Sequence, residues 1–364
     1  MMEENELWFW LLSLERLGPV SHRRLFEYYG DIREIWRAKN PPLTEKQKEE
    51  FLDSRQEDRI RRSFHEMRRA GIRMVTAVEP DYPRRLRAIY DAPYGLFVKG
   101  ELPNPNAPAV AIIGARRCTH HGGIIAEHTA AELTRAGILI ISGLAIGIDS
   151  CSHQGALSAG GKTYAVMGCG PDICYPSSHR NLYEQIASHG GILSEYPPGR
   201  EVRPAYFPLR NRIISGLADL VLVVEARERS GSLITVDQAL EQGREVMAVP
   251  GRPDDPLSVG CNRLIREGAA ICTESSDVCR LLGLDQNSPG KTSAVPVSSS
   301  GSACERTEEE LQILKILTAE PLHTEQISLE SGIPVPALLP ILLRLELSGC
   351  VRQVTSGRFQ KTTN

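Results

Sequence analysis

The sequence has no apolar run that approaches the roughly 20 residues a helix needs to cross a bilayer. Its first residues, Met1–Trp8, contain neither the basic segment nor the cleavage site of a secretory signal. Hydrophobic residues make up 41% of the 364 residues, enough for two or three domains with a full-sized core. We therefore expect a soluble, cytoplasmic protein that does not contact a membrane.

Cysteine motifs for metal binding are also missing. Nine Cys occur, but none form a Cys-X-X-Cys pair, and Cys169 and Cys174 have no second pair that would complete a zinc site. The pattern indicates scattered reduced thiols, so we expect no metal.

The excess of positive charge that nucleic-acid-binding proteins often have is absent. The net charge is -3 and the isoelectric point is near 6.3. Local patches can override this total. Of the 42 cationic residues, 34 are Arg and eight are Lys. Arg is the better bidentate phosphate ligand and stacks on bases, although a codon bias toward Arg explains the ratio equally well.

Residues 95–275 alternate between apolar runs and helix-like segments. Continuous apolar runs are typical of buried parallel strands. The alternation predicts an α/β fold with an extended Rossmann-like, doubly wound, mostly parallel sheet. The expected strands are 95–99, 109–114, 138–143, 163–168, 191–195, 220–225, 245–250 and 269–272. The expected helices are 122–136, 148–159, 178–188, 208–216, 232–242 and 261–267.

Helical segments precede the sheet. An apolar helix at 7–14, a turn at 17–21 and a helix at 24–30 resemble a helix-hairpin-helix or SAM-like module, whose turn amides can touch a DNA backbone. A small packing or protein-contact bundle is the alternative that we prefer. A helix over 55–73 carries seven Arg, which indicates a solvated basic face or, alternatively, a surface that steers DNA.

Two segments follow the sheet. Residues 285–306 are rich in Ser, Pro, Gly and Ala, which predicts a flexible linker. Residues 307–364 contain three helical patterns and a hairpin pattern, which resemble a winged helix. Its expected recognition helix, 336–347, is mostly apolar apart from Arg344, so protein contact is at least as good an interpretation as groove reading. The predicted domains are 1–75 (helical), 76–284 (sheet), 285–306 (linker) and 307–364 (winged helix).

Doubly wound sheets bind ligands at the carboxyl ends of their strands. The first such loop, Gly114–Arg117, lacks the Gly-X-Gly-X-X-Gly fingerprint, so we expect no dinucleotide cofactor. Arg116 would instead project a guanidinium across the top of the sheet, unless it is a surface Arg without a role. Gly143 opens the next loop and allows a ligand to approach the backbone closely.

Asp149 and His153 follow that loop and lie four residues apart on the expected helix. This spacing lets the two side chains face each other. It fits an acid–base pair or, as we prefer, a structural pair that fastens the helix to the loop, because the sequence places no Ser or Cys nucleophile with it.

An aromatic ring and two guanidinium groups lie close together in the segment that begins at Phe207. Phe207 precedes a Pro, so we expect its backbone to stay outside a helix and its ring to stack on a base. Arg210 and Arg212 are two residues apart and would diverge by about 200° on a helix. We therefore expect one of them to reach the ligand and the other to hold the loop or a carboxylate such as Glu225.

A turn of small residues completes the set. Ser230, Gly231 and Ser232 are expected to offer hydroxyls and free amides at the start of a helix, where anions bind. A stacking face, phosphate ligands and an anion-binding helix end would then meet at one sheet edge, without a nucleophile–base pair. The combination favours binding of a polyanion, a single strand of nucleic acid, over catalysis.

Eight motifs follow one another in a characteristic order: Gly114–Arg117, Ser142–Asp149, Gly168–Pro176, Ser194–Gly199, Phe207–Leu217, Val223–Ala226, Ser230–Thr235 and Ala248–Gly251. Together they resemble the DprA/Smf family, the DNA-processing proteins of natural transformation. The resemblance covers roughly 75–275. It implies a homodimer that binds single-stranded DNA regardless of sequence. It also implies that the protein displaces single-strand-binding protein and loads a RecA-type recombinase. Because the sequence shows neither a nucleophile–base pair nor a dinucleotide fingerprint, we expect no enzymatic activity and no cofactor.

The resemblance also assigns residues. It implies a DNA pocket made by Gly114, Arg116, Phe207, Arg210, Arg212, Ser230, Gly231 and Ser232. To this pocket we add Gly143, because its loop allows a ligand to approach the backbone closely. The resemblance places the dimer or partner surface near the end of the sheet, predicted at Asn262, Leu264, Ile265 and Ile271. Ala115 stands where the family often has Ser, and His121 where Tyr is common. These two departures change the detailed contacts but not the role of Arg116.

Two alternatives remain open. The first is a nucleotide-hydrolysing Rossmann enzyme of the lysine-decarboxylase-like type, which uses a Pro-Gly-Gly-X-Gly-Thr loop and a catalytic Glu. The comparable loop here, Ser230–Thr235, differs in its chemistry and is followed by Asp237. The second is a transcription factor that acts through residues 307–360.

Overall fold

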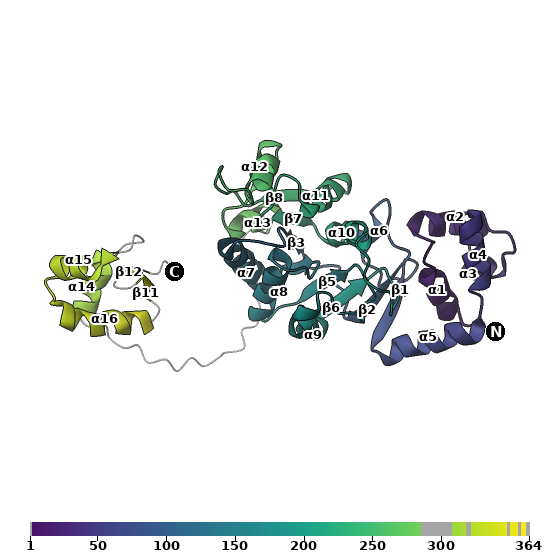
Figure 1. The fold of residues 1–364 in the computed structure, drawn as a ribbon, viewed down its shortest axis with the longest axis horizontal. Coiled ribbons are helices and arrows are strands. Elements are labelled where there is room, and N and C mark those ends of the chain that lie inside the picture. The colour runs from purple at the N-terminus through teal and green to yellow at the C-terminus, as the bar shows by residue number, and fades with distance from the viewer. Residues whose placement is uncertain (1, 285–307, 318–321, 348–349, 356–357, 362–364) are drawn as a thin grey trace. The chain divides into compact units, whose positions relative to one another are not determined.

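The chain folds into two compact units, Met1–Pro289 and Gly290–Asn364 (Figure 1). The computed structural model describes residues 2–284, 308–317, 322–347, 350–355 and 358–361. The linker predicted at 285–306 lies outside these residues. No helix in the described ranges has both the length and the apolar character that crossing a membrane requires.

A nine-stranded sheet forms the centre of the first unit, in the order β1-β2-β6-β5-β4-β3-β7-β8-β9. The strands from β6 to β9 in this order run parallel, while β2 pairs antiparallel with both β1 and β6. The strands are β1 (Ile72–Thr76), β2 (Gly95–Gly100), β3 (Ala109–Ile113), β4 (Leu139–Ser142), β5 (Thr163–Met167), β6 (Gly190–Ser194), β7 (Leu220–Val223), β8 (Glu245–Ala248) and β9 (Ala270–Ile271).

Helices cover both faces of the sheet, because alternate strand residues point to opposite sides. On β3, Ala111 and Ile113 pack toward one layer, and Val110 and Ile112 toward the other. The first layer contains α6 (Arg84–Arg87), α10 (Tyr206–Leu217), α11 (Gly231–Glu241) and α12 (Val259–Arg266). The second contains α7 (His120–Arg135), α8 (Ile148–Ser158), α9 (Arg180–Ser188) and α13 (Ser275–Leu281).

This architecture confirms the predicted doubly wound sheet, and every predicted strand is present. One strand of this sheet, β1, was not predicted. The prediction extended a basic helix from 55 to 73, but α5 (Glu57–Arg69) ends near Gly71, whose φ of 70° stops a helix. Arg73 therefore lies on β1, opposite Val98 of β2, and not on the basic helix.

Five helices precede the sheet and share an aromatic core that includes Phe97 of β2. They are α1 (Glu4–Ser13), α2 (Pro19–Tyr29), α3 (Ile32–Arg37), α4 (Glu45–Asp53) and α5. The turn predicted at 17–21 was wrong in extent, since α2 already begins at Pro19. A Pro is accommodated at the first position of a helix, where no backbone N–H bond is lost.

The second unit has the three helices and the hairpin that the sequence predicts for a winged helix. Its elements are α14 (Glu308–Ile316), β10 (Leu322–His323), α15 (Thr324–Ser331), α16 (Val335–Leu347), β11 (Val351–Thr355) and β12 (Arg358–Lys361). Leu338, Ile341 and Leu345 of α16 are buried in its core. Arg344, the one cation of this helix, pairs with Glu310 at 3.1 Å.

Candidate nucleic-acid interface

A cavity of about 770 Å³ opens at the carboxyl ends of the parallel strands. It lies where the strand order reverses, because β3 connects through α7 to β4 on one side and pairs with β7 on the other. Ligands of doubly wound sheets bind at such switch points. The loop after β3 contributes Gly114 and Arg116 to the wall, and the loop after β7 contributes Ser230–Ser232.

Phe207 forms the centre of the wall. Its half-buried ring has the guanidinium carbon of Arg116 at 5.4 Å and that of Arg210 at 5.9 Å from its centroid. The ring of Tyr175 lies 5.5 Å away and is 44% exposed. A cation placed over the face of an aromatic ring is attracted to it electrostatically, in a cation–π interaction. Residues about ninety positions apart therefore build one platform of two rings and two guanidinium groups.

The backbone prediction for Phe207 was wrong. The helix α10 begins at Tyr206, so Phe207 and Pro208 both lie in its first turn. Pro is tolerated there because the first backbone N–H groups of a helix have no partner within the helix. The Pro therefore helps to start the helix and does not keep Phe207 out of it.

Arg210 forms part of the cavity floor and is 4% exposed. Its Nη1 donates hydrogen bonds to the carbonyl oxygens of Gly143, at 2.9 Å, and Val166. Burial lowers the pKa of Arg210 to about 10, so it stays cationic at neutral pH. Its Nε has no hydrogen-bond partner among the described residues. A Cβ on Gly143 would lie 2.6 Å from the Arg210 Nη1, which explains the Gly at this position.

Arg212 points away from the cavity, as its helical spacing predicts. It is 5% exposed and pairs with Glu195 at 2.6 Å and with Asp91 at 3.3 Å. The suggested partner, Glu225, was wrong. The Glu225 carboxylate instead accepts hydrogen bonds from the backbone N–H and the hydroxyl of Thr119, at 2.9 and 2.5 Å. Arg212 and Gly143 are the two predicted pocket residues that do not line the cavity.

The small-residue turn starts a helix, as predicted. Ser230 is the N-cap of α11, and its Oγ accepts a hydrogen bond from the Ser232 N–H at 3.4 Å. The two hydroxyls are 2.7 Å apart. Nothing lies within 4 Å of the place where a Cβ on Gly231 would stand. The helix end is therefore open to the cavity.

Three cations of the cavity were missed by the sequence analysis: Arg117, Arg227 and Arg229. With Arg116 and Arg210 they make five Arg among the described lining residues, against one acid, Asp149. The local charge is thus positive in a chain whose net charge is -3. Arg227 and Arg229 could have been found from the sequence, because they lie between β7 and the turn at Ser230. Tyr175 was quoted as part of a motif but not recognised as a ring of the wall.

Asp149 and His153 do not bond to each other. The Asp149 Oδ2 accepts hydrogen bonds from the backbone N–H groups of Gly143, at 3.1 Å, and Ala145, at 3.4 Å. Burial raises the pKa of Asp149, and the nearby Arg210 opposes this shift. The Nδ1 of His153 lies 2.7 Å from the Thr163 hydroxyl, and burial lowers its pKa to about 3. Each side chain fastens α8 to a different neighbour, and no acid–base pair is formed.

The predicted partner surface is partly occupied by the fold itself. Leu264 is 6% exposed and packs in the core of the first helix layer. Asn262 holds a loop, since its side chain exchanges two hydrogen bonds with the backbone of Gly251, at 2.9 and 3.1 Å. Ile265 is partly buried, and Ile271 is 50% exposed. Of the four, Ile271 offers the largest fraction of its surface to a partner.

Comparison with known proteins identifies the family. A family profile described as DNA recombination-mediator protein A matches residues 73–283, and one described as DprA winged helix domain matches residues 297–357. The chain belongs to the DprA/Smf family. The Protein Smf of Synechocystis is 34% identical over 99% of this chain and 100% of its own length.

Two solved DprA structures resemble the chain. The DNA processing protein A of Streptococcus pneumoniae has 35% sequence identity and a TM-score of 0.67, over 77% of this chain and 98% of that one. The DNA processing protein A of Helicobacter pylori has 28% identity and a TM-score of 0.53, over 59% and 98%. The structure of the H. pylori protein is described as giving insight into a single-stranded DNA binding mode. The DprA/Smf profile spans every residue that lines the cavity.

Proposed function

We propose that the chain binds single-stranded DNA without sequence preference and that the arginine-lined cavity is its binding site. The observation that carries the proposal is the platform of Arg116, Phe207, Arg210 and Tyr175. A base can stack on an aromatic ring whatever its identity, for about 1–3 kcal/mol per base. The flanking Arg and the open N-terminus of α11 suit the phosphates on either side of that base. The single-stranded DNA binding of the H. pylori relative supports this proposal.

The chemistry of the cavity supports a binding protein and not an enzyme. Its one carboxylate, that of Asp149, accepts hydrogen bonds from backbone amides, and His153 lies outside the lining residues. The hydroxyls of Ser230 and Ser232 contact each other and the helix cap, with no base beside them among the described residues. An adjacent general base is the usual means of activating a Ser hydroxyl as a nucleophile.

Membership of the DprA/Smf family supports a proposal for the cellular role. We propose that the chain acts in DNA uptake and recombination in the cytoplasm, as a homodimer that displaces single-strand-binding protein and loads a RecA-type recombinase. The exposed Ile271 side of the sheet is the proposed partner surface.

The binding proposal is tested with labelled oligothymidylate, oligoadenylate and mixed-sequence strands of equal length, titrated in one buffer. Affinities within about a factor of three are expected, because stacking and phosphate contacts tolerate any base. A preference of a hundredfold or more for one sequence would contradict the proposal. For the recombinase role, DNA strand exchange started on strands covered by single-strand-binding protein should become faster when the chain is added.

A further inference from the structure

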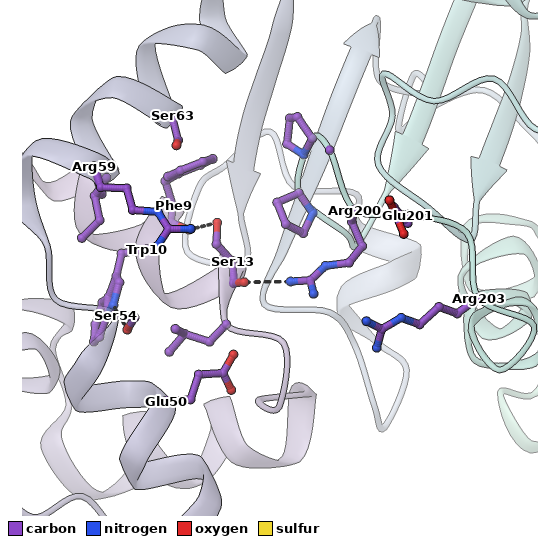
Figure 2. Close-up of a pocket in the computed structure, with 15 residues that line it drawn as sticks. Phe9, Trp10, Ser13, Glu50, Ser54, Arg59, Ser63, Arg200, Glu201 and Arg203 are labelled. Carbon is purple, nitrogen blue, oxygen red and sulfur yellow. Dashed lines mark hydrogen bonds between the residues drawn. The ribbon is translucent and has the colours of Figure 1, made fainter.

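A second cavity, of about 530 Å³, lies between the N-terminal helices and the loop that leads into α10 (Figure 2). Ser13 of α1 and Arg59 and Ser63 of α5 line one side. Arg200 and Arg203 line the other, and Figure 2 shows both extending from the loop toward the side that carries Arg59. Three cations from segments far apart in the sequence thus face one space.

This second cavity adjoins the cavity on the sheet. Arg203 lines the second cavity, and the next residue, Pro204, lines the first. Consecutive Cα atoms are about 3.8 Å apart. Phe207, the centre of the stacking platform, follows three residues later. A strand that leaves the platform past Pro204 therefore comes directly to Arg203.

The arginines of the loop converge on one anionic group. The carboxylate of Glu15 contacts Arg200 at 2.8 Å through Oε2 and contacts Arg203 through Oε1. The Tyr206 hydroxyl lies 3.4 Å from Oε1. A single carboxylate with two guanidinium partners marks a position that also fits a phosphate, since Arg forks bind both groups bidentately.

Glu15 is not among the residues that line the second cavity. Two other carboxylates do line it, and neither holds an arginine of the loop in the described structure. That of Glu50 accepts hydrogen bonds from the backbone N–H groups of Glu15, at 2.6 Å, and Arg16, at 2.9 Å. That of Glu201 belongs to an exposed residue. The rings of Phe9 and Trp10 are 6% and 2% exposed, so they form a wall and offer no face for stacking.

We propose that the second cavity is a backbone subsite for the same single strand, in which a phosphate binds Arg200 and Arg203 in competition with the Glu15 carboxylate. Arg59 adds a charge from the opposite wall. The subsite holds the sugar–phosphate backbone and no base, because its aromatic rings are covered. This inference rests on the proposed binding of single-stranded DNA and extends the strand's path from the sheet to the N-terminal helices.

The substitution Glu15→Gln distinguishes a phosphate subsite from a purely structural ion pair, in which Glu15 only holds the loop and so positions Phe207. The two cases predict opposite changes in affinity for DNA. Binding is measured with oligothymidylates of about 6 nucleotides, which fill only the first cavity, and of about 20 nucleotides, which reach both. The subsite predicts that Glu15→Gln raises affinity for the longer strand about threefold to tenfold, because a competing anion is removed. It predicts no change for the shorter strand. If the ion pair is purely structural, Glu15→Gln should instead weaken binding, because Phe207 loses its position. A weaker affinity for either strand therefore overturns the proposal.

A second pair of variants tests the opposite wall. Arg59→Ala should weaken binding of the longer strand about threefold to tenfold and reduce the salt slope by about 0.7, the value for one phosphate contact on a single strand. Arg68→Ala is the matched control, because it lies nine residues further along α5 and therefore on the opposite side of the helix. Equal losses in both variants would indicate a diffuse basic field and overturn the subsite.

Different results contradict the proposed binding of single-stranded DNA and the proposed subsite. A wild-type protein that binds neither strand contradicts the proposed function itself. A wild-type protein that binds both strands, with Glu15→Gln and Arg59→Ala unchanged, contradicts only the subsite. Thermal unfolding of each variant should stay close to that of the wild type, since Arg59 is exposed and Gln keeps the shape of Glu15.

Discussion

Replacing Phe207 separates the contribution of base stacking to DNA affinity from the contribution of charge at the cavity on the sheet. The ring has Arg116, Arg210 and Tyr175 within 6 Å of its centroid and carries no charge itself. Stacking of one base contributes about 1–3 kcal/mol, so Phe207→Ala should weaken binding of single-stranded DNA roughly 5- to 150-fold. The dependence of affinity on salt should keep its slope, because every phosphate ligand remains.

The assay is fluorescence anisotropy of a labelled oligothymidylate at several salt concentrations. Phe207→Leu retains an apolar side chain but lacks a flat face, so it should lose most of the same affinity. Leu209→Ala is the matched control, because this neighbour on α10 is 54% exposed and does not line the cavity. If Phe207→Leu binds as tightly as the wild type, or if the salt slope falls along with the affinity, the stacking role is refuted.

Three further predictions concern charge and burial. Arg116→Ala should weaken single-strand binding about tenfold and lower the salt slope by about 0.7 in anisotropy titrations, since it removes an exposed Arg that we propose binds a phosphate. Arg212→Ala should instead cost about 3 kcal/mol of stability in urea unfolding, because it leaves the Glu195 carboxylate without its buried partner. Its affinity for DNA, measured while folded, should change less than twofold. The unfolding free energy should also fall by about 2 kcal/mol per buried His between pH 7 and pH 5. Burial lowers the pKa of His22 to about 4 and that of His153 to about 3, so the unfolded chain takes up protons below about pH 6.5 that the folded chain does not bind.

The sheet could be predicted from the sequence because its strands are continuous apolar runs with helical patterns between them. Val110–Ile113 shows why this works, since both faces of β3 are covered and every one of its residues is buried. The strand β1 could not be found in this way. It contains Arg73 and follows a basic helix, and only its antiparallel pairing with β2 makes it a strand.

The candidate site was predictable where the local spacing determines the geometry. The divergence of Arg210 from Arg212 follows from 100° per residue, and the cap at Ser230 follows from its small polar side chain. The buried partners were not predictable. Which carboxylate Arg212 reaches depends on the position of Glu195 after β6, and no local pattern distinguishes Glu195 from Glu225.

The most direct test of the central claim compares single-stranded with duplex DNA of the same length and sequence, each at two salt concentrations. The proposed stacking on Phe207 needs an unpaired base, so we expect much tighter binding of the single strand, with the difference preserved at the higher salt. Equal binding of both forms, weakened in parallel by salt, would show that only the charge of the arginines is used. That result would contradict a stacking site at Phe207.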